Sequence, residues 1–398
     1  MLTSSALVLF MTPGLAFFYG GMTRQKNILS TIMQSYFIMG IVSVQWAVIG
    51  YTLAFGTDIG TVIGGLDYIF LNGVGQGPSP FAKTIPDLLF MVYQGMFAVI
   101  TPALISGAFA ERMRFGPFVV FTLLWSTLVY DPIAHWVWGG GWLGTGHVGA
   151  LDFAGGTVVH ISSGVAALAA AIVLGRRLGW PKEQVIPHNL PLTVLGAGIL
   201  WFGWFGFNAG SALASSGLAT SAFVATHLAA AAATISWGLM EYLQRGKASV
   251  LGAASGSVAG LVAITPASGF VGPMAAIVIG LGAGALCYFA VSMKFALRYD
   301  DALDVVGVHG VGGAFGAIAT GLFASVAVNS AGADGLFYGN VGQVWAQVVG
   351  VVATVVYSFV VSFILLKVVD ATMGLRASEE EEVMGLDLSQ HGERAYSL

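Results

Sequence analysis

Charged residues are scarce in this chain of 398 residues. Asp, Glu, Lys and Arg make up 9% of it, whereas a soluble domain carries roughly 25%. Hydrophobic residues account for 57%, and the mean hydropathy is +0.84. The net charge of -4 and the lack of a basic patch interleaved with aromatic residues argue against nucleic acid as a partner. The composition therefore predicts an integral protein of the lipid bilayer.

Cysteine is almost absent as well. The single Cys287 excludes an intramolecular disulfide and a thiolate cluster for a metal. The sequence also lacks a phosphate-binding loop and a recognisable group of nucleophile, base and orienting residue. We therefore expect no enzymatic activity, no metal and no resident cofactor.

Long apolar runs are what the chain has instead. Runs of about 20 residues cross roughly 30 Å of hydrocarbon, and we find eleven of them, the sixth and eighth diluted by glycine and other small residues. Their expected limits are 2–22, 28–55, 86–109, 116–138, 154–175, 189–208, 218–243, 249–265, 272–292, 303–324 and 341–368.

The positions of Lys and Arg give an orientation. If eleven spans alternate, every Lys and Arg except Lys83 falls on one side of the membrane, as expected for cytoplasmic segments. Arg24 and Lys26 follow the first span, so this span is a retained helix rather than a signal peptide. The sequence predicts a multi-pass protein of the cytoplasmic (plasma) membrane, with its N-terminus outside and its C-terminus in the cytoplasm.

Two local patterns recur five spans apart. Spans three and eight share the tetrapeptide at Ile100–Ala103 and Ile264–Ala267, and spans five and ten each place an aspartate eight residues before a histidine. An odd number of crossings per repeat puts the two halves in opposite orientations, as in many transporters. We expect an all-α membrane fold of five plus five helices in an inverted repeat, followed by an eleventh helix.

This pattern also divides the chain. We expect a transmembrane transport domain over residues 1–369 and a cytoplasmic regulatory tail over 370–398. Within the transport domain, the expected parts are repeat one at about 1–177, repeat two at about 185–325 and the eleventh helix at about 341–368. A tail this rich in acidic residues could also be solvated and disordered.

The repeated histidines are His160, after Asp152, and His309, after Asp301. At about 1.5 Å per residue each lies roughly 12 Å from its own face of the membrane, so the two reach similar depths. Ionisable groups in the bilayer are costly and normally functional, and we predict a close imidazole pair that lines a pathway. Two alternatives stay open: each ring bonds only a neighbouring helix, or the pair ligates haem.

Asp152 stands where span five begins, and Gly155 and Gly156 follow it. Its carboxylate can cap the exposed N–H groups of the helix start. Direct binding of a cation is the competing role. We favour the cap, because it explains the position without requiring an ion to pass the aromatic residues nearby.

Four segments of the chain closely resemble the ammonium transporter (Amt/Mep/Rh) family, in particular its microbial Amt branch. They are residues 107–112 (GAFAER), 152–160 (DFAGGTVVH), 201–211 (WFGWFGFNAGS) and 305–311 (VVGVHGV). The resemblance extends from the first span into the acidic tail. It implies the ammonium transporter fold, a homotrimer, and a narrow hydrophobic pore for ammonium or ammonia in each subunit.

The resemblance also implies roles for particular residues. From the outside inward these are substrate-binding Trp138, Phe97, Ser211 and Tyr93, gate-forming Phe97 and Phe207, and pore-lining His160 and His309. Tyr93 departs from the phenylalanine expected in many relatives. Relatives bind PII signalling proteins at the tail, which makes such a protein a candidate partner.

Elementary chemistry is consistent with this route. The ring faces of Trp138 and Phe97 attract a cation by about 1–2 kcal/mol where it is desolvated, and the Ser211 hydroxyl can accept an N–H bond. An ion that stays charged pays many kcal/mol in an apolar pore, whereas ammonium can release its proton and cross as ammonia. Selectivity over potassium would follow from deprotonation.

Each of these residues also has a structural interpretation. A tryptophan at a helix end often anchors the membrane interface, and phenylalanine, serine and tyrosine commonly fill helix contacts. A second candidate function is an ammonium sensor on the same fold. Uptake of methylammonium, an analogue of the substrate, would separate a transporter from a sensor that binds without flux.

Overall fold

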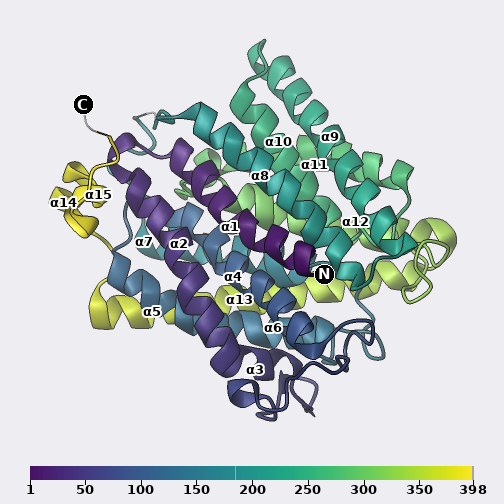
Figure 1. Ribbon diagram of the computed structural model, residues 1–398. Helices are drawn as coiled ribbons and strands as arrows, with labels where there is room; N and C mark the ends of the chain where they lie inside the picture. Colours follow the sequence, from purple (N-terminus) through teal and green to yellow (C-terminus); the bar gives the residue numbers. More distant parts are fainter. Residues whose placement is uncertain (184, 397–398) are drawn as a thin grey trace.

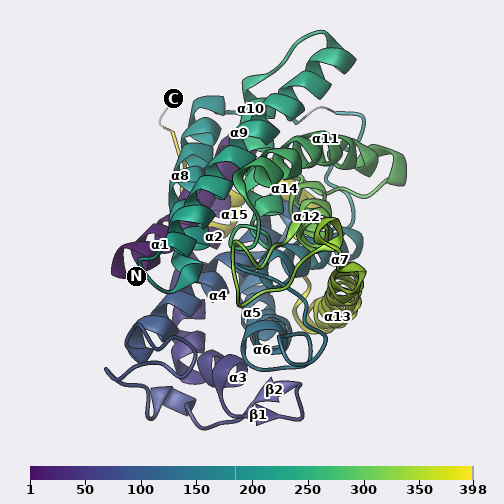
Figure 2. The same ribbon diagram turned by 90° about the vertical axis from the view of Figure 1, so that its right-hand side faces the viewer.

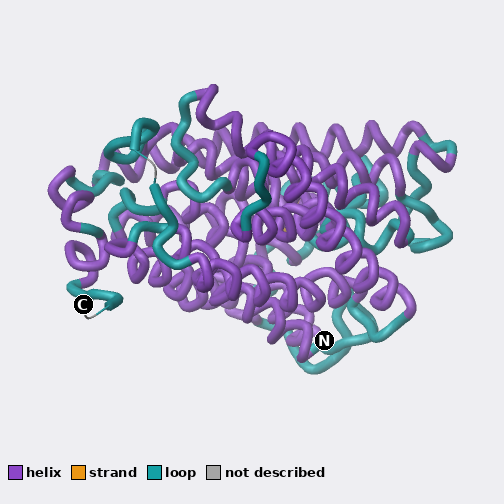
Figure 3. The backbone as a smooth tube through the Cα atoms, turned by 90° about the horizontal axis from the view of Figure 1, so that it is seen from above, coloured by secondary structure: helices purple, strands orange, loops and turns teal. Residues whose placement is uncertain are grey.

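The computed structural model describes residues 1–183 and 185–396, and most of this backbone is helical, with loops joining the helices (Figure 3). The first half contains α1 (Leu2–Met22), α2 (Ile28–Gln45), α3 (Tyr51–Phe55), α4 (Asp87–Phe109), α5 (Phe115–Trp125), α6 (Asp131–Trp138) and α7 (Ser162–Leu174). The second half contains α8 (Leu190–Asn208), α9 (Gly217–Arg245), α10 (Val250–Ile264), α11 (Pro273–Leu297), α12 (Gly312–Phe323), α13 (Val341–Met373), α14 (Glu379–Met384) and α15 (Leu386–His391).

Shorter elements join or extend these helices. Four are π turns, namely η2 (Trp46–Gly50), η4 (Ser126–Tyr130), η5 (Gly156–Ile161) and η7 (Val306–Val311). Four are 3-10 turns, namely η1 (Gln25–Asn27), η3 (Ile69–Leu71), η6 (Ala209–Ala212) and η8 (Leu336–Tyr338). A small antiparallel hairpin pairs β1 (Asp58–Ile59) with β2 (Ile63–Gly64).

All eleven predicted spans are present among the described residues. Ten are long and apolar enough to cross a membrane. The remaining one, α10, is an apolar helix of 15 residues, or about 22 Å at 1.5 Å per residue. The predicted ends differ most for α11 and α13, which continue to Leu297 and Met373. The expected all-α membrane fold is therefore confirmed.

Three membrane-spanning helices of the second half begin at side-chain caps. Asn189 accepts the Leu192 N–H at 3.0 Å before α8, and Ser249 accepts the Gly252 N–H at 2.9 Å before α10. Ser216 caps α9 in the same manner. These bonds satisfy donors that a helix start leaves open, so the sequence fixes where these spans begin.

Glycine determines how closely the helices pack. A Cβ built on Gly196 of α8 would lie 2.2 Å from the Phe18 nitrogen of α1, so the first helices of the two repeats meet at backbone distance. On α10, a Cβ on Gly256 or Gly260 would lie 2.6 Å from side-chain carbons of α9. Small residues allow this approach where lipid offers no hydrophobic driving force between helices.

The bundle has two distinct ends. The tail helices α14 and α15 and the C-terminus lie at one edge of it (Figure 1). The β1–β2 hairpin and α3 lie at the end far from the C-terminus (Figure 2). The tail is helical over 379–384 and 386–391 rather than disordered, and residues 397–398 of the predicted tail lie outside the described residues.

Candidate functional site

A cavity of about 400 Å³ lies on the face formed by the loops around Thr145 and Asn329. Its walls include Phe97 of α4, Trp138 of α6 and Ser211 of η6. The Phe97 and Trp138 rings meet edge to face, with centroids 6.0 Å apart. The Trp138 indole N–H donates to the Asp152 carbonyl oxygen at 2.9 Å, which fixes the indole at the cavity wall.

Tyr93 lies behind this cavity rather than in its wall. Its side chain is fully buried, and its hydroxyl lies 2.9 Å from the Phe207 carbonyl oxygen and 3.2 Å from Ser211 Oγ. The Ser211 hydroxyl also donates to the Phe207 carbonyl at 2.9 Å. With its proton used there, Ser211 Oγ can present a lone pair to a donor in the cavity.

Two aromatic rings lie between this cavity and the space beside the histidines: Phe97 lines the outer cavity and Phe207 lines the inner space. The Phe97 and Phe207 centroids are 4.3 Å apart with the rings tilted by 37°, and each side chain is only 1% exposed. The two residues belong to different repeats, on α4 and α8. The two buried rings are therefore in direct contact across the boundary between the repeats.

The two histidines meet below these rings. The Nδ1 atoms of His160 and His309 are 3.3 Å apart, with ring centroids at 5.3 Å. The close imidazole pair that the depth argument predicts is present. Because neutral imidazole carries one donor and one acceptor nitrogen, one ring donates to the other through Nδ1.

The surroundings of the pair are apolar and narrow. The ring of His160 stacks on Trp204 at 5.4 Å and lies 6.1 Å from Phe207. A cavity of about 10 Å³ beside both histidines is lined otherwise by apolar side chains of α1, α4, η5, α8 and α10. This is about the space of one water molecule. Haem cannot lie between rings in direct contact, so that alternative is excluded.

Local backbone geometry makes the ring contact possible. Each histidine belongs to a π turn, His160 to η5 and His309 to η7, and π turns occur often at functional sites. A Cβ on Gly164 would lie 2.2 Å from the Gly310 nitrogen. The two spans therefore cross at backbone contact, next to the histidines.

Asp152 is a helix cap. Its Oδ1 accepts the N–H groups of Gly155 at 2.8 Å and Gly156 at 2.6 Å. Its Oδ2 accepts the Thr157 N–H at 2.8 Å and also bonds the Thr157 hydroxyl. Both carboxylate oxygens are thus occupied by donors at the start of η5, as the capping interpretation predicts.

A second cavity, of about 550 Å³, lies at the other end of the bundle. Charged residues in its wall include Arg177, Lys294 and Asp304, and Lys294 forms an ion pair with Asp304. Nearby Asp301, the counterpart of Asp152, accepts the Val306 N–H at 2.7 Å through Oδ2 alone. Burial, moderated by Lys294, raises the pKa of Asp301 to about 6.

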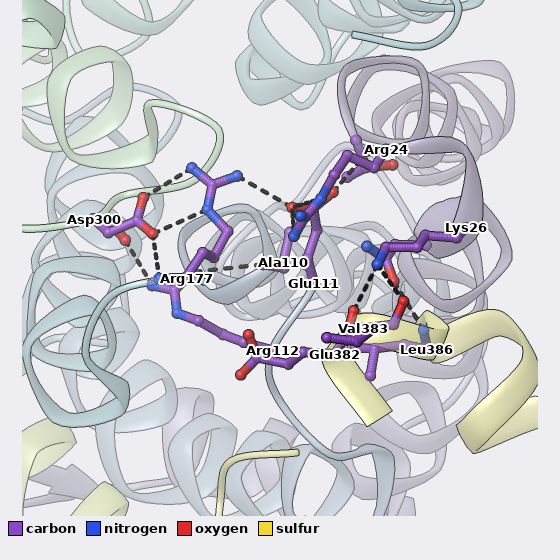
Figure 4. A network of polar contacts seen from close by, with 12 residues as sticks. Arg24, Lys26, Ala110, Glu111, Arg112, Arg177, Asp300, Glu382, Val383 and Leu386 are labelled. Atoms are coloured by element: carbon purple, nitrogen blue, oxygen red, sulfur yellow. Dashed lines mark hydrogen bonds and ion pairs between the residues drawn. The ribbon is translucent and has the colours of Figure 1, made fainter. Parts of the chain in front are cut away.

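A buried ion network joins the two repeats at this end (Figure 4). Arg177 bonds Asp300 at 2.8 Å and Glu111 at 3.4 Å, and Arg24 bonds Glu111 at 2.9 Å. Burial raises the pKa of Glu111, but Arg177 and Arg24 outweigh it and hold that pKa below its usual value. The pKa of Asp300 is likewise lowered, because Arg177 outweighs the effect of burial.

The tail docks beside this network. Lys26 Nζ donates to the carbonyl oxygens of Glu382 at 2.8 Å and Val383 at 2.6 Å (Figure 4). The Asp387 carboxylate accepts the Leu29 and Ser30 N–H groups at 3.1 and 2.8 Å. It thereby caps the start of α2 and ties the tail to the membrane-spanning part.

The positions of several residues near these sites were not predicted from the sequence. Trp204, which stacks on His160, was hidden among the many apolar residues of its span. Asp131 carries a signal that could have revealed it, because it is an acidic residue inside an apolar span. The docking of the tail left no pattern in the sequence.

Comparison with known proteins gives consistent matches over the whole chain. The profile of the Ammonium Transporter Family matches residues 1–396. The ammonium transporter of Bacillus subtilis is 56% identical over 397 residues, covering 100% of this chain and 97% of that protein. The crystal structure of Candida albicans Mep2 has a TM-score of 0.90 at 41% identity, covering 99% of this chain and 89% of that one. A structure described as a sensor Amt protein has a TM-score of 0.90 at 31% identity, covering 98% and 96%.

Proposed function

The chain belongs to the ammonium transporter family and is a multi-pass membrane protein that transports ammonium, not an enzyme; we propose a route for that transport. Ammonium is recruited in the outer cavity, loses its proton at the aromatic gate, and continues as ammonia past the two histidines. The observation that carries the proposal is the series of contacts that runs from Phe97 in the cavity wall through Phe207 to the imidazole pair.

Recruitment rests on the walls of the outer cavity. The faces of Phe97 and Trp138 attract a cation, and the Ser211 lone pair accepts one of its N–H bonds. Potassium gains from the rings but has no N–H to donate. Tyr93 acts indirectly, because its hydroxyl orients Ser211 from behind the wall.

Deprotonation rests on the change in surroundings at the gate. Beyond Phe97 and Phe207 the space shrinks to about 10 Å³ with mostly apolar walls. A charge there would lose its hydration and gain no paired counter-ion, at a cost of many kcal/mol. Neutral ammonia avoids this cost, so the gate selects the species that can give up a proton.

The histidine pair serves both the passage of ammonia and the transfer of the released proton. Neutral imidazoles can accept from and donate to ammonia in turn, and the Nδ1–Nδ1 contact fixes which nitrogen of each ring faces the pore. The pair also offers a path for the released proton toward the inner cavity. We propose that the proton takes this path, so that transport is electrogenic.

Current recordings on proteoliposomes test the route. The wild-type protein is expected to give ammonium-dependent currents and none with potassium, and a His160→Ala, His309→Ala double variant should lose the ammonium current. An Asp67→Asn variant, changed at an exposed outer loop, serves as the control. Unchanged currents in the double variant would show that the proton does not pass the histidines.

The second candidate function is that of an ammonium sensor. The likeness to the sensor Amt protein supports it, as does a helical tail tied to α2 by Asp387 and Lys26. A sensor would bind methylammonium in the outer cavity without carrying it into vesicles. Measuring binding and uptake on one preparation separates the two functions.

The assembly and orientation belong to the same proposal. We propose a homotrimer in the cytoplasmic membrane, with the outer cavity facing out and the tail in the cytoplasm, because the cationic residues gather at the tail end. The mass of the detergent-solubilised protein tests the trimer. A pull-down with a PII protein, using the chain with and without residues 378–398, tests that partner.

A further inference from the structure

Asp131 is an acidic residue buried within the membrane-spanning part, outside the transport route. Its side chain is fully buried, and Gln45 beside it is 7% exposed. Asp131 Oδ2 accepts the Gln45 Nε2–H at 2.8 Å. Among the described residues, neither Asp131 Oδ1 nor Gln45 Oε1 has a hydrogen-bond partner. One hydrogen-bonded pair therefore holds two buried oxygens that are unsatisfied.

No cation compensates this carboxyl group. Within the described part of the chain, no Lys, Arg or His forms an ion pair with Asp131. His135, one turn further along α6, uses its ring nitrogens on the Ala54 carbonyl at 3.0 Å and Asp58 at 2.9 Å. Tyr130 precedes Asp131 and is neutral. An unpaired carboxylate in such a place costs several kcal/mol, and a carboxyl group avoids this cost by keeping its proton.

The backbone is adapted to the pair. Gln45 is the last residue of α2 and precedes the π turn η2, whereas Asp131 is the first residue of α6 and follows the π turn η4. A Cβ on Gly50 would lie 3.0 Å from both terminal atoms of Gln45, so glycine makes room for the amide. The other two π turns of the chain's described part carry the histidines.

We propose that Asp131 is a protonated carboxyl group which, together with Gln45, binds one water molecule and pins α6 to α2 behind the gate. The Asp131 hydroxyl donates to the water, and the water donates to Gln45 Oε1, which satisfies both orphaned oxygens. A water bound to buried polar groups in this way is a normal part of a protein interior. A metal cation would need more oxygen ligands than this pair supplies.

The Gln45–Asp131 pair is connected to the Phe97–Phe207 gate through neighbouring aromatic residues. This step rests on the proposed transport function. Trp46, next to Gln45, donates from its indole N–H to the Met91 carbonyl of α4 at 3.0 Å. A Cβ on Gly95 would lie 2.8 Å from the Trp46 ring, and Phe97 follows two residues later. Tyr130 packs on Trp46 with centroids 6.2 Å apart. Asp131 is thus a positioning residue, because the two aromatic side chains beside the pair support the α4 segment that carries the gate.

Infrared spectroscopy of the reconstituted protein tests the proton directly. We expect a protonated-carboxyl C=O band at neutral pH that shifts in D2O and is missing in Asp131→Asn. The exposed Asp67→Asn change should leave this band in place. A wild-type spectrum without the band would show that Asp131 is an ionised carboxylate. A thermal stability that rises with sodium, potassium or ammonium, and that loses this dependence in Asp131→Asn, would show that the pair is a cation site. Either result would overturn the proposal.

Transport kinetics test the positioning role. Asp131→Asn keeps a neutral polar group and is expected to retain the wild-type KM for methylammonium, whereas Asp131→Leu should raise it by roughly tenfold at a similar protein yield. Equal KM values for Leu and Asn would refute the positioning role. The infrared band does not depend on transport, so its presence in a protein without flux would count against the proposed function alone.

Discussion

Gly164 and Gly310 touch at backbone distance where the fifth and tenth spans cross. A Cβ on Gly164 would lie 2.2 Å from the Gly310 nitrogen and 2.9 Å from the carbonyl carbon of His309. The contact between the two imidazoles at 3.3 Å depends on this approach, because a wider crossing would carry the rings apart. A residue that takes no part in chemistry thus sets the geometry of the pair.

Gly164→Ala should therefore separate the histidines. The added methyl group has only backbone to push against, which costs about 1–3 kcal/mol in a packed interior, and we expect transport to fall by roughly tenfold or more. Gly198→Ala is the matched control, since beyond its own chain neighbours and the adjacent helix backbone no atom lies within 4 Å of a Cβ built there. Wild-type uptake by the Gly164→Ala protein would contradict the argument.

Asp152→Asn is expected to lower stability and transport together. Both carboxylate oxygens of Asp152 accept hydrogen bonds from backbone N–H groups. Asparagine replaces one of these oxygens with an NH2 group, which cannot accept the bonds that the oxygen accepted. Leaving such buried groups unsatisfied costs about 1–3 kcal/mol each. Thermal unfolding in detergent and vesicle uptake are the measurements. A variant with full stability but no transport would instead indicate that the charge of Asp152 acts on the substrate.

Tyr93→Phe tests the support of Ser211. Removal of the hydroxyl takes away the contacts at 2.9 Å and 3.2 Å to the Phe207 carbonyl and Ser211. A hydrogen bond of this kind contributes about 1 kcal/mol, so we expect the KM for methylammonium to rise roughly fivefold, with a smaller change in the maximal rate. An unchanged KM would show that Ser211 is oriented without Tyr93.

Asp301→Asn should change how stability depends on pH. The pKa of Asp301 is raised from 3.8 to about 6, so the folded protein holds a proton that the unfolded chain releases in this interval. Wild-type stability therefore gains from Asp301 below pH 3.8 and loses that contribution as pH rises through 6, by about 3 kcal/mol. The asparagine variant retains the Val306 bond without titrating. Thermal unfolding from pH 4 to 7 should show a flatter profile for it, and parallel profiles would refute the assignment.

The primary structure by itself determined the spans, their number and the depth of the histidines. Hydropathy over about 20 residues is a local property, and the fixed rise of a helix converts eight residues after Asp152 or Asp301 into a depth. Asp152 could be recognised as a cap for the same reason, because its bonds reach only to residues 155–158. The resemblance to a family supplied the proposed roles of Trp138 and Phe97. Composition alone did not distinguish these two residues from the other aromatic residues.

Only the tertiary structure decided which side chains meet. The partners Gln45 and Asp131 are 86 positions apart, and Arg177 and Asp300 are 123 apart. Tyr93 lies behind the cavity wall rather than in it, and the tail caps α2 through Asp387. A hydropathy pattern gives a helix its length but not its rotation about its own axis or its neighbours. Those follow from close packing across the whole bundle, where glycine contacts and buried polar pairs select one arrangement.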